Sequence, residues 1–171
     1  LYEVKTVIDK GDQSKFIKFQ PINQLLDDNS LSLSEFNPRG YSINADRVYK
    51  LFVNEFNDYN ELISVLSKNE YVKQQIKDFN KKDQTKALIR YAKLFKISKV
   101  SKKKEITQRY ITFKWHDIDE GTELLNDSLM LILSNVKSTI YNDIDNLATS
   151  IEMKTKREIE NFKINVSQIE K

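Results

Sequence analysis

The chain has 171 residues, of which 28 are Lys or Arg and 25 are Asp or Glu, so its net charge is only +3. This weak excess of positive charge gives no indication of nucleic-acid binding, which normally requires a strongly basic surface. Because the sequence contains no cysteine, it excludes disulfides, thiol catalysis and cysteine-ligated metals. The longest apolar run, Leu129 to Leu133, is far too short to cross a bilayer.

The first quarter of the chain predicts a strand followed by short elements. Residues 1–8 alternate between two sets of side chains, which is typical of a half-buried strand, and residues 10–14 predict a turn. We expect a short extended segment over residues 16–19 and a helical turn over residues 22–26. Residues 27–41, which include an Asn-Pro-Arg-Gly sequence, have the composition of a loop.

The middle of the chain predicts several helices. Asn44 is a good cap for the first of them, which carries Leu51, Phe52 and Phe56 on one face. Asp58, followed by a glutamate three residues later, predicts a new helix start. A short helix is expected over 71–76 and a longer one over 82–97. A lysine run from 96 to 104 follows, and a solvated loop is its simplest interpretation; contact with anionic lipid or polysaccharide is the alternative.

The last third predicts one strand and one very long helix. Ile111, Phe113 and Trp115 alternate with polar residues, as a half-buried strand requires. Asp117 and Glu120 then form a capping-box pattern, and no proline occurs between there and the end of the chain. A helix of about 50 residues is on the order of 75 Å long, which exceeds the diameter of a domain of this size. We therefore expect it to leave the body of the protein and to need partners.

An apolar stripe follows this predicted helix. Its members recur every three or four residues, and we expect them to pack the helix on its own body or on a neighbouring protomer: Leu129, Leu133, Val136, Ile140, Ile144, Leu147 and Ile151. The expected core of the body consists of six residues: Leu51, Phe52, Phe56, Ile111, Phe113 and Trp115. The sequence thus predicts an α/β (α+β) base domain over 1–116, built on a small mixed sheet, and a long helical arm over 117–171. The near part of that helix is expected to pack on the base.

Catalysis finds little support in the sequence. His116 is the single histidine and stands beside two aspartates, which allows a metal site or a base, but one histidine with capping residues is a thin basis for either. The segment 117–121 departs from a calcium-binding loop in the position of its glycine, and capping explains it better. We expect no enzymatic activity, no cofactor and no bound metal.

Three segments, Val48–Ile76, Tyr110–Trp115 and Asp119–Lys171, together resemble the periplasmic part of the chain-length determinant family, the Wzz-type polysaccharide co-polymerases of bacterial inner membranes. In that family an aromatic-rich helix precedes, further along the chain, an extended strand and a very long charged helix. Leu51-Phe52 and Phe56-Asn57 match the first helix, and Ile111-Thr112-Phe113 followed by Glu120 matches the strand and the helix start. Lys154-Thr155-Lys156-Arg157-Glu158 is similar to the stretch where the family's long helix becomes fully polar.

The resemblance implies a membrane-proximal base, an arm projecting into the periplasm and protomers arranged as a homo-oligomeric ring. Such proteins set the modal length of a lipid-linked polysaccharide, such as the O-antigen of lipopolysaccharide, which a separate membrane polymerase makes. The family's two transmembrane helices and the return half of its arm are absent from this sequence. We therefore expect the chain to be a piece of a longer, membrane-anchored protein. The family offers no motif from which a sugar-contacting residue can be transferred.

Two alternatives remain open at this point. One is a co-polymerase for capsule or exopolysaccharide that is coupled to a cytoplasmic kinase. The other is a structural coiled-coil adaptor, for which a folded body with its own strands and core would be unnecessary.

Overall fold

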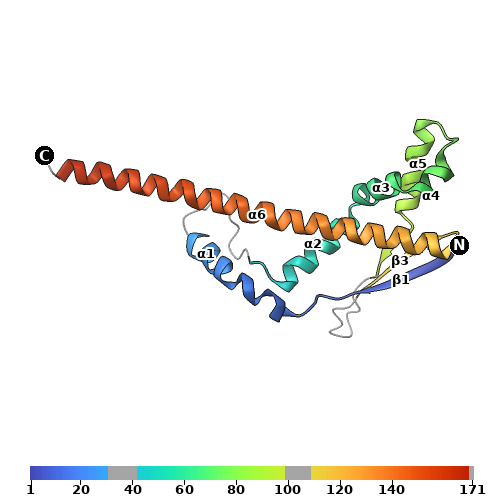
Figure 1. Cartoon of the computed structure of the whole chain (residues 1–171), viewed down its shortest axis with the longest axis horizontal. Helices are drawn as coiled ribbons and strands as arrows, with labels where there is room; N and C mark the ends of the chain where they lie inside the picture. Colours follow the sequence, from blue (N-terminus) through green and yellow to red (C-terminus); the bar gives the residue numbers. More distant parts are fainter. Residues whose placement is uncertain (31–41, 99–108, 170–171) are drawn as a thin grey trace. The chain divides into compact units, whose positions relative to one another are not determined.

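The computed structural model describes residues 1–30, 42–98 and 109–169 of the chain (Figure 1). These residues form two compact units. Unit 1 consists of Leu1–Lys15 and Asn44–Val136, and unit 2 consists of Phe16–Ile43 and Lys137–Lys171. The fold contains a small sheet, several short helices and one very long C-terminal helix, as the sequence predicts. The sheet was expected to be mixed, whereas both strand pairs among the described residues are antiparallel.

The sheet of unit 1 has three strands in the order β1-β3-β2, and both neighbouring pairs are antiparallel. β1 spans Tyr2–Ile8, β2 spans Phe95–Ile97 and β3 spans Arg109–Trp115. The structure confirms the two strands expected from the alternating pattern. Val4 lies opposite Phe113 in the β1–β3 pair, and Phe95 lies opposite the same residue in the β2–β3 pair. Phe113 therefore occupies the middle of the sheet.

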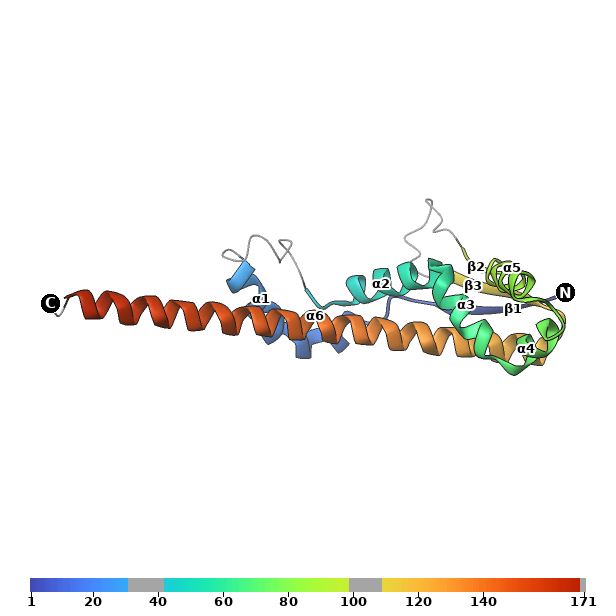
Figure 2. The ribbon, with the colours of Figure 1, turned by 90° about the horizontal axis from the view of Figure 1, so that it is seen from above.

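Four short helices lie between Asn44 and β2 in unit 1. They are α2 (Ala45–Asn57), α3 (Tyr59–Lys68), α4 (Glu70–Ile76) and α5 (Lys81–Ala92). Each begins at a side chain that accepts a hydrogen bond from a backbone N–H of the first turn, which the helix itself leaves unpaired: Asn44, Asp58, Asn69 and Asn80. The helix starts expected at Asn44 and Asp58 are thus confirmed. The helices α3, α4 and α5 gather at the end of unit 1 where β1 starts and α6 begins (Figure 2).

Two predicted elements are wrong. The helix expected over 82–97 ends at Ala92, and Phe95–Ile97 forms β2 instead. Phe95–Ile97 has only three residues and is apolar at both ends, so its pattern fits either a helix or a strand. The pairing of this segment with β3 makes it a strand. The segment expected to be extended over 16–19 belongs to a 3₁₀ helix, η1 (Gln13–Phe19), which leads directly into α1 (Gln20–Ser30).

The loop expected over 27–41 is helical up to Ser30, and the rest of it lies outside the described residues. The lysine run from 96 to 104 is likewise described only in part. Lys96 lies exposed on β2, and the lysines from 99 to 104 lie outside the described residues.

An aromatic stack fills the core of unit 1. The ring of Phe113 lies 4.0 Å from that of Phe95 and 5.5 Å from that of Trp115, both nearly parallel to it. Phe56 of α2 meets Phe95 edge-on at 6.1 Å, and Tyr91 of α5 meets Trp115 edge-on at 5.0 Å. Such offset and edge-on geometries add to the free energy that burial of the rings supplies. The stack joins the sheet to the helices.

The long helix α6 spans Ile118–Ile169. The Asp117 carboxylate accepts hydrogen bonds from the backbone N–H groups of Asp119 and Glu120, so the expected cap is present. The Glu120 side chain, however, accepts a hydrogen bond from the indole Nε1 of Trp115 at 2.8 Å. Its role is therefore to fasten the end of β3 to the first turn of α6, rather than to complete the capping box.

Gly121 is a position at which α6 lies close to the sheet. A Cβ atom at this residue would lie 3.0 Å from Cβ of Trp115, which is tighter than ordinary van der Waals contact. From there to Val136, one side of α6 is buried in unit 1 through Leu124, Leu125, Ser128 and Ile132. The buried hydroxyl of Ser128 donates a hydrogen bond to the carbonyl oxygen of Leu124, so its burial leaves no donor unsatisfied.

The division into units does not follow the boundary expected between residues 116 and 117. The first part of α6, up to Val136, belongs to unit 1, and the segment Phe16–Ile43 belongs to unit 2 with the rest of α6. The physical reason is long-range packing. Ile43 is 1% exposed and packs against η1 and α1 on one side and against α6 on the other: Phe16, Phe19, Ile22, Ile140, Ile144 and Leu147.

Candidate functional site

The junction between β3 and α6 contains the polar cluster that surrounds the single histidine. His116 Nε2 lies 3.0 Å from Glu120 Oε2, the same oxygen that accepts the Trp115 hydrogen bond, and 3.3 Å from Nε2 of Gln75 on α4. Within residues 1–30, 42–98 and 109–169, no group of three or more His, Cys, Asp and Glu side chains is arranged to hold a metal. The cluster acts as a polar link between α4 and the start of α6.

A second contact ties the same two helices together. The hydroxyl of Tyr71 on α4 donates a hydrogen bond to Oε2 of Glu123 on α6 at 3.2 Å. This hydrogen bond to the Glu123 carboxylate, together with the negative charge of that group, raises the pKa of Tyr71 above its ordinary value. Together with the His116 cluster, the contact fixes α4 against the first two turns of α6.

The residues expected to form the body's core lie in unit 1. Phe52, Phe56, Ile111, Phe113 and Trp115 are buried, and Leu51 is half-buried on α2. Their surroundings are apolar and aromatic, so they serve packing rather than chemistry.

The expected apolar stripe on α6 has different environments along its length. Val136 is buried and Leu129 is half-buried in unit 1, whereas Leu133 is 49% exposed. Beside this face, Nδ2 of Asn135 donates a hydrogen bond to Oε2 of Glu61 on α3 at 2.7 Å. The near part of the stripe therefore contributes to the unit's own core.

The remaining members of the stripe lie in unit 2. Ile140, Ile144 and Leu147 pack against Ile43 but stay partly exposed, and Ile151 is also half-buried. Asn23 of α1 supports this cluster, because its side chain accepts a hydrogen bond from the N–H of Ile43 at 2.8 Å and donates one to the carbonyl oxygen of Ile43 at 3.2 Å.

Beyond Ile151, α6 carries apolar side chains that remain in solvent. Four of them recur at spacings of three and four residues, which places them on one face of the helix, with exposed fractions of 51%, 70%, 38% and 84%: Ile159, Phe162, Val166 and Ile169. Ion pairs along the same part of the helix, such as Lys156 with Glu152 at 2.7 Å, contribute little because they are exposed. This exposed apolar face is the strongest candidate for contact with a partner.

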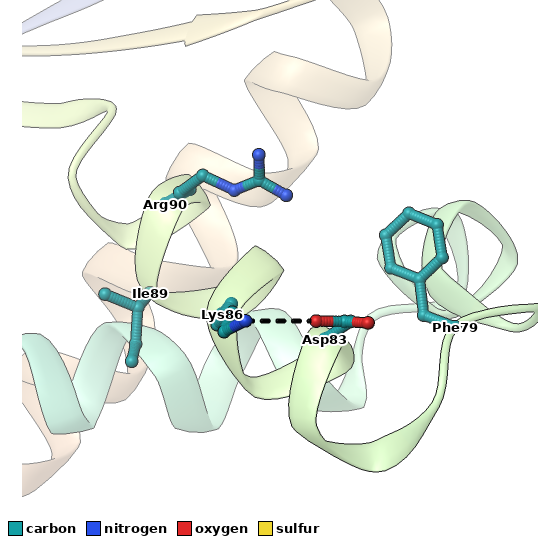
Figure 3. Close-up of a pocket in the computed structure, with 5 residues that line it drawn as sticks. All are labelled: Phe79, Asp83, Lys86, Ile89 and Arg90. Atoms are coloured by element: carbon teal, nitrogen blue, oxygen red, sulfur yellow. Dashed lines mark hydrogen bonds and ion pairs between the residues drawn. The ribbon is translucent and has the colours of Figure 1, made fainter.

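A surface feature that the sequence did not predict lies on unit 1. An open pocket of about 640 Å³ lies along α5 and is lined by Phe79, Asp83, Lys86, Ile89 and Arg90. Figure 3 shows four of these residues on α5 and Phe79 on the turn before it, with Nζ of Lys86 facing the Asp83 carboxylate at 3.3 Å. The recurrence of basic residues every four positions along α5 is the sequence signal that could have revealed it.

Comparison with protein-family models and with curated proteins finds no match to this chain. Among the residues that the structure describes, no helix combines the length and the apolar character needed to cross a membrane.

Proposed function

We propose that this chain is the periplasmic part of a membrane-anchored polysaccharide co-polymerase. It acts without chemistry of its own as an oligomeric scaffold that sets the chain length of a lipid-linked polysaccharide made by a separate polymerase. The observation that carries the proposal is α6, a 52-residue helix that begins in the core of an α/β unit and continues with an exposed apolar face. The resemblance of Val48–Ile76, the β3 strand and α6 to the chain-length determinant family supplies the substrate class.

The architecture of unit 1 supports a scaffold more than a simple helical stalk. A stalk needs no sheet, whereas here α6 starts against an aromatic core and is fastened to it through Gly121 and the Trp115–Glu120 hydrogen bond. A base of this kind holds the first turns of the helix in one place on the fold. Identical copies are then able to pack through the same two surfaces, and a homo-oligomeric ring forms where the rotation between neighbours closes.

The exposed face of α6 supports an oligomer for an energetic reason. Ile159 and Phe162 are more than half exposed, and covering apolar side chains contributes roughly 1.5–3 kcal/mol for each one that becomes fully buried. A face repeated in every copy of a ring gains this free energy at each interface. The homo-oligomer is therefore the partner that this proposal assigns to the far half of α6.

The function is tested by a gel of surface polysaccharide from cells with and without the full-length gene. We expect a modal cluster of chain lengths that collapses to an unregulated ladder on deletion and returns when the gene is restored. An unchanged ladder would refute the proposal.

Two sets of variants separate assembly from folding. Replacing Ile140 and Ile144 with aspartate is expected to weaken assembly. Because both residues also pack against Ile43, the same change would lower the stability of unit 2. Replacing the exposed Ile159 and Phe162 with aspartate leaves the packed core untouched. We expect this second pair to lower the oligomer mass measured by analytical ultracentrifugation and to broaden the polysaccharide distribution.

The matched control for the second pair carries Asn161→Asp and Gln168→Asp, which add the same charge at exposed polar positions of the same helix. Both the oligomer mass and the polysaccharide ladder should remain those of the wild type. An equal loss of assembly in the control would show that added charge, rather than the apolar face, controls the result.

A further inference from the structure

The helix α5 divides its surface into two faces of opposite character. Ala87 and Ala92 are buried and Leu88 and Tyr91 are half-buried, and this side packs against the rest of unit 1, including α3. The other side carries basic residues spaced so that they lie within an arc of about 100° on the helix: Lys82, Lys86, Arg90 and Lys93. All four side chains are exposed, so the outer face of α5 is a cationic stripe.

Around this stripe, basic residues outnumber acidic residues far more than they do in the chain as a whole. Residues 68–96 contain nine Lys and Arg but three Asp and Glu, whereas the whole chain has 28 against 25. Two of the three acidic residues already have basic partners, because Asp83 pairs with Lys86 and Glu70 pairs with Lys73. This part of unit 1 is therefore strongly positive, although the protein as a whole is nearly neutral.

Two exposed apolar side chains lie within the cationic surface. Phe79 is 41% exposed on the turn before α5, and Ile89 is 38% exposed on α5 at the edge of the cationic stripe (Figure 3). Single exposed apolar side chains are common on protein surfaces, but these two adjoin basic residues around the same surface pocket. Such apolar side chains are the groups that enter the boundary between headgroups and acyl chains when a basic helix lies on a bilayer.

We propose that the outer face of α5, with Phe79, is a docking surface for an anionic lipid bilayer, in which lysine and arginine contact lipid phosphates while Phe79 and Ile89 enter the headgroup boundary. The cationic stripe extends over about 16 Å along the helix, which suits a lattice of lipid phosphates better than a single small anion. The inference rests on the proposed function in one respect, since a membrane-anchored protein brings this surface within reach of headgroups.

The position of α5 within unit 1 also suits contact with a membrane. The start of β1, the helix α4 and the helix α5 lie at the same end of unit 1 (Figures 1 and 2). The contacts of Tyr71 with Glu123 and of Gln75 with His116 connect α4 to the start of α6. Docking of α5 on a flat surface would thus orient all of unit 1, and with it the first turns of α6.

The proposal is tested by co-sedimentation of the 171-residue chain with vesicles of phosphatidylcholine that contain phosphatidylglycerol, and with vesicles of phosphatidylcholine alone. The test variant carries Lys82→Gln, Lys86→Gln and Arg90→Gln. Each basic residue near an anionic surface contributes enough attraction that removing three should weaken binding to the anionic vesicles about 100-fold. Far-ultraviolet circular dichroism confirms that the variant is folded.

The matched control carries Lys156→Gln, Arg157→Gln and Lys163→Gln, which remove the same charge from exposed positions of α6. It should bind anionic vesicles like the wild type. A second variant, Phe79→Ala with Ile89→Ala, keeps every charge and should weaken binding about tenfold. This loss differs from the effect of high salt, which screens the charges and leaves the apolar contacts intact.

Three outcomes would overturn the inference. The first is equal binding to both kinds of vesicle, and the second is an equal loss of binding in the α5 variant and its control. The third is displacement of the protein from vesicles by millimolar-range inorganic phosphate, which would mean a site for a free anion. Because vesicle binding is measured without any polysaccharide, its failure leaves the length-regulation proposal standing. An unchanged polysaccharide ladder would equally leave the lipid contact standing.

Discussion

Units 1 and 2 bury their apolar residues to very different degrees. Unit 1 contains a complete aromatic and aliphatic core, with Phe113, Leu62 and Ile132 almost fully buried. In unit 2, among the side chains that the structure describes, Ile43 is the one apolar residue below a tenth exposed, and its neighbours are partly buried. The same helix α6 serves both units. Unit 1 is thus stabilised by its own interior, whereas the described part of unit 2 buries little apolar surface of its own.

The comparison shows why a helix can be continuous in backbone structure and yet change its source of stability along its length. Up to Val136, tertiary packing against unit 1 holds α6. Beyond Ile151, backbone hydrogen bonds and exposed ion pairs remain, and these contribute little to the stability of a helix by themselves.

The largest expected effect comes from the centre of unit 1. Phe113→Ala removes a ring that is 0% exposed and stacked between Phe95 and Trp115, so it should lower the free energy of unfolding by about 3 to 5 kcal/mol. Urea denaturation followed by far-ultraviolet circular dichroism measures the loss. Phe162→Ala, at a position that is 70% exposed on α6, is the control; in protein dilute enough to be monomeric, it should change the stability by no more than about 0.5 kcal/mol. Similar losses in the two variants would contradict the difference between the units.

A smaller effect is expected where α6 meets the sheet. Alanine normally stabilises a helix relative to glycine by about 1 kcal/mol, but at Gly121 the new Cβ would press on Cβ of the buried Trp115. We expect the overpacking to outweigh this gain, so that Gly121→Ala lowers the free energy of unfolding by about 1 kcal/mol net in the same denaturation experiment. Ser134→Ala on an exposed turn of the same helix should be neutral or slightly stabilising. A gain of stability at Gly121 would show that α6 is packed on the sheet less tightly.

The smallest expected effect concerns the contact between α4 and α6. Because the folded state raises the pKa of Tyr71 above 10.0, the protonated hydroxyl contributes stability fully below the unfolded pKa, and this stability is lost as pH rises through the folded value. Tyr71→Phe should therefore be less stable than the wild type at neutral pH, and the difference should shrink above pH 10. Parallel urea titrations of the wild type and Tyr71→Phe across this pH range measure the difference. A difference that persists at high pH would contradict this contact.

Local patterns in the sequence predicted most elements of this fold. The strands β1 and β3 followed from alternation, the starts of α2 and α3 followed from Asn44 and Asp58, and the length of α6 followed from the absence of proline. The strand β2 was missed because Phe95 and Ile97 also fit the periodicity of the preceding helix. The division into units was missed because it depends on the contact of Ile43 with α6, about a hundred residues away, which no local pattern contains.

The candidate surfaces were predicted less completely. The apolar stripe on α6 was visible from its spacing, but its spacing is the same where Val136 is buried and where Leu133 is exposed. Only the neighbouring elements determine which members contribute to the protein's own core. The basic face of α5 was overlooked because its lysines are dispersed in sequence and converge only when the helix forms.

Amide hydrogen exchange of the chain at a series of protein concentrations tests the central claim most directly. We predict that residues 118–136 of α6 are protected equally at every concentration, because unit 1 packs them. Residues beyond Ile151 should exchange rapidly in dilute protein and become protected as copies associate. If the far half of α6 exchanges at the same rate in dilute and concentrated protein, association with further copies does not stabilise it, and the account of α6 as an assembling arm is contradicted.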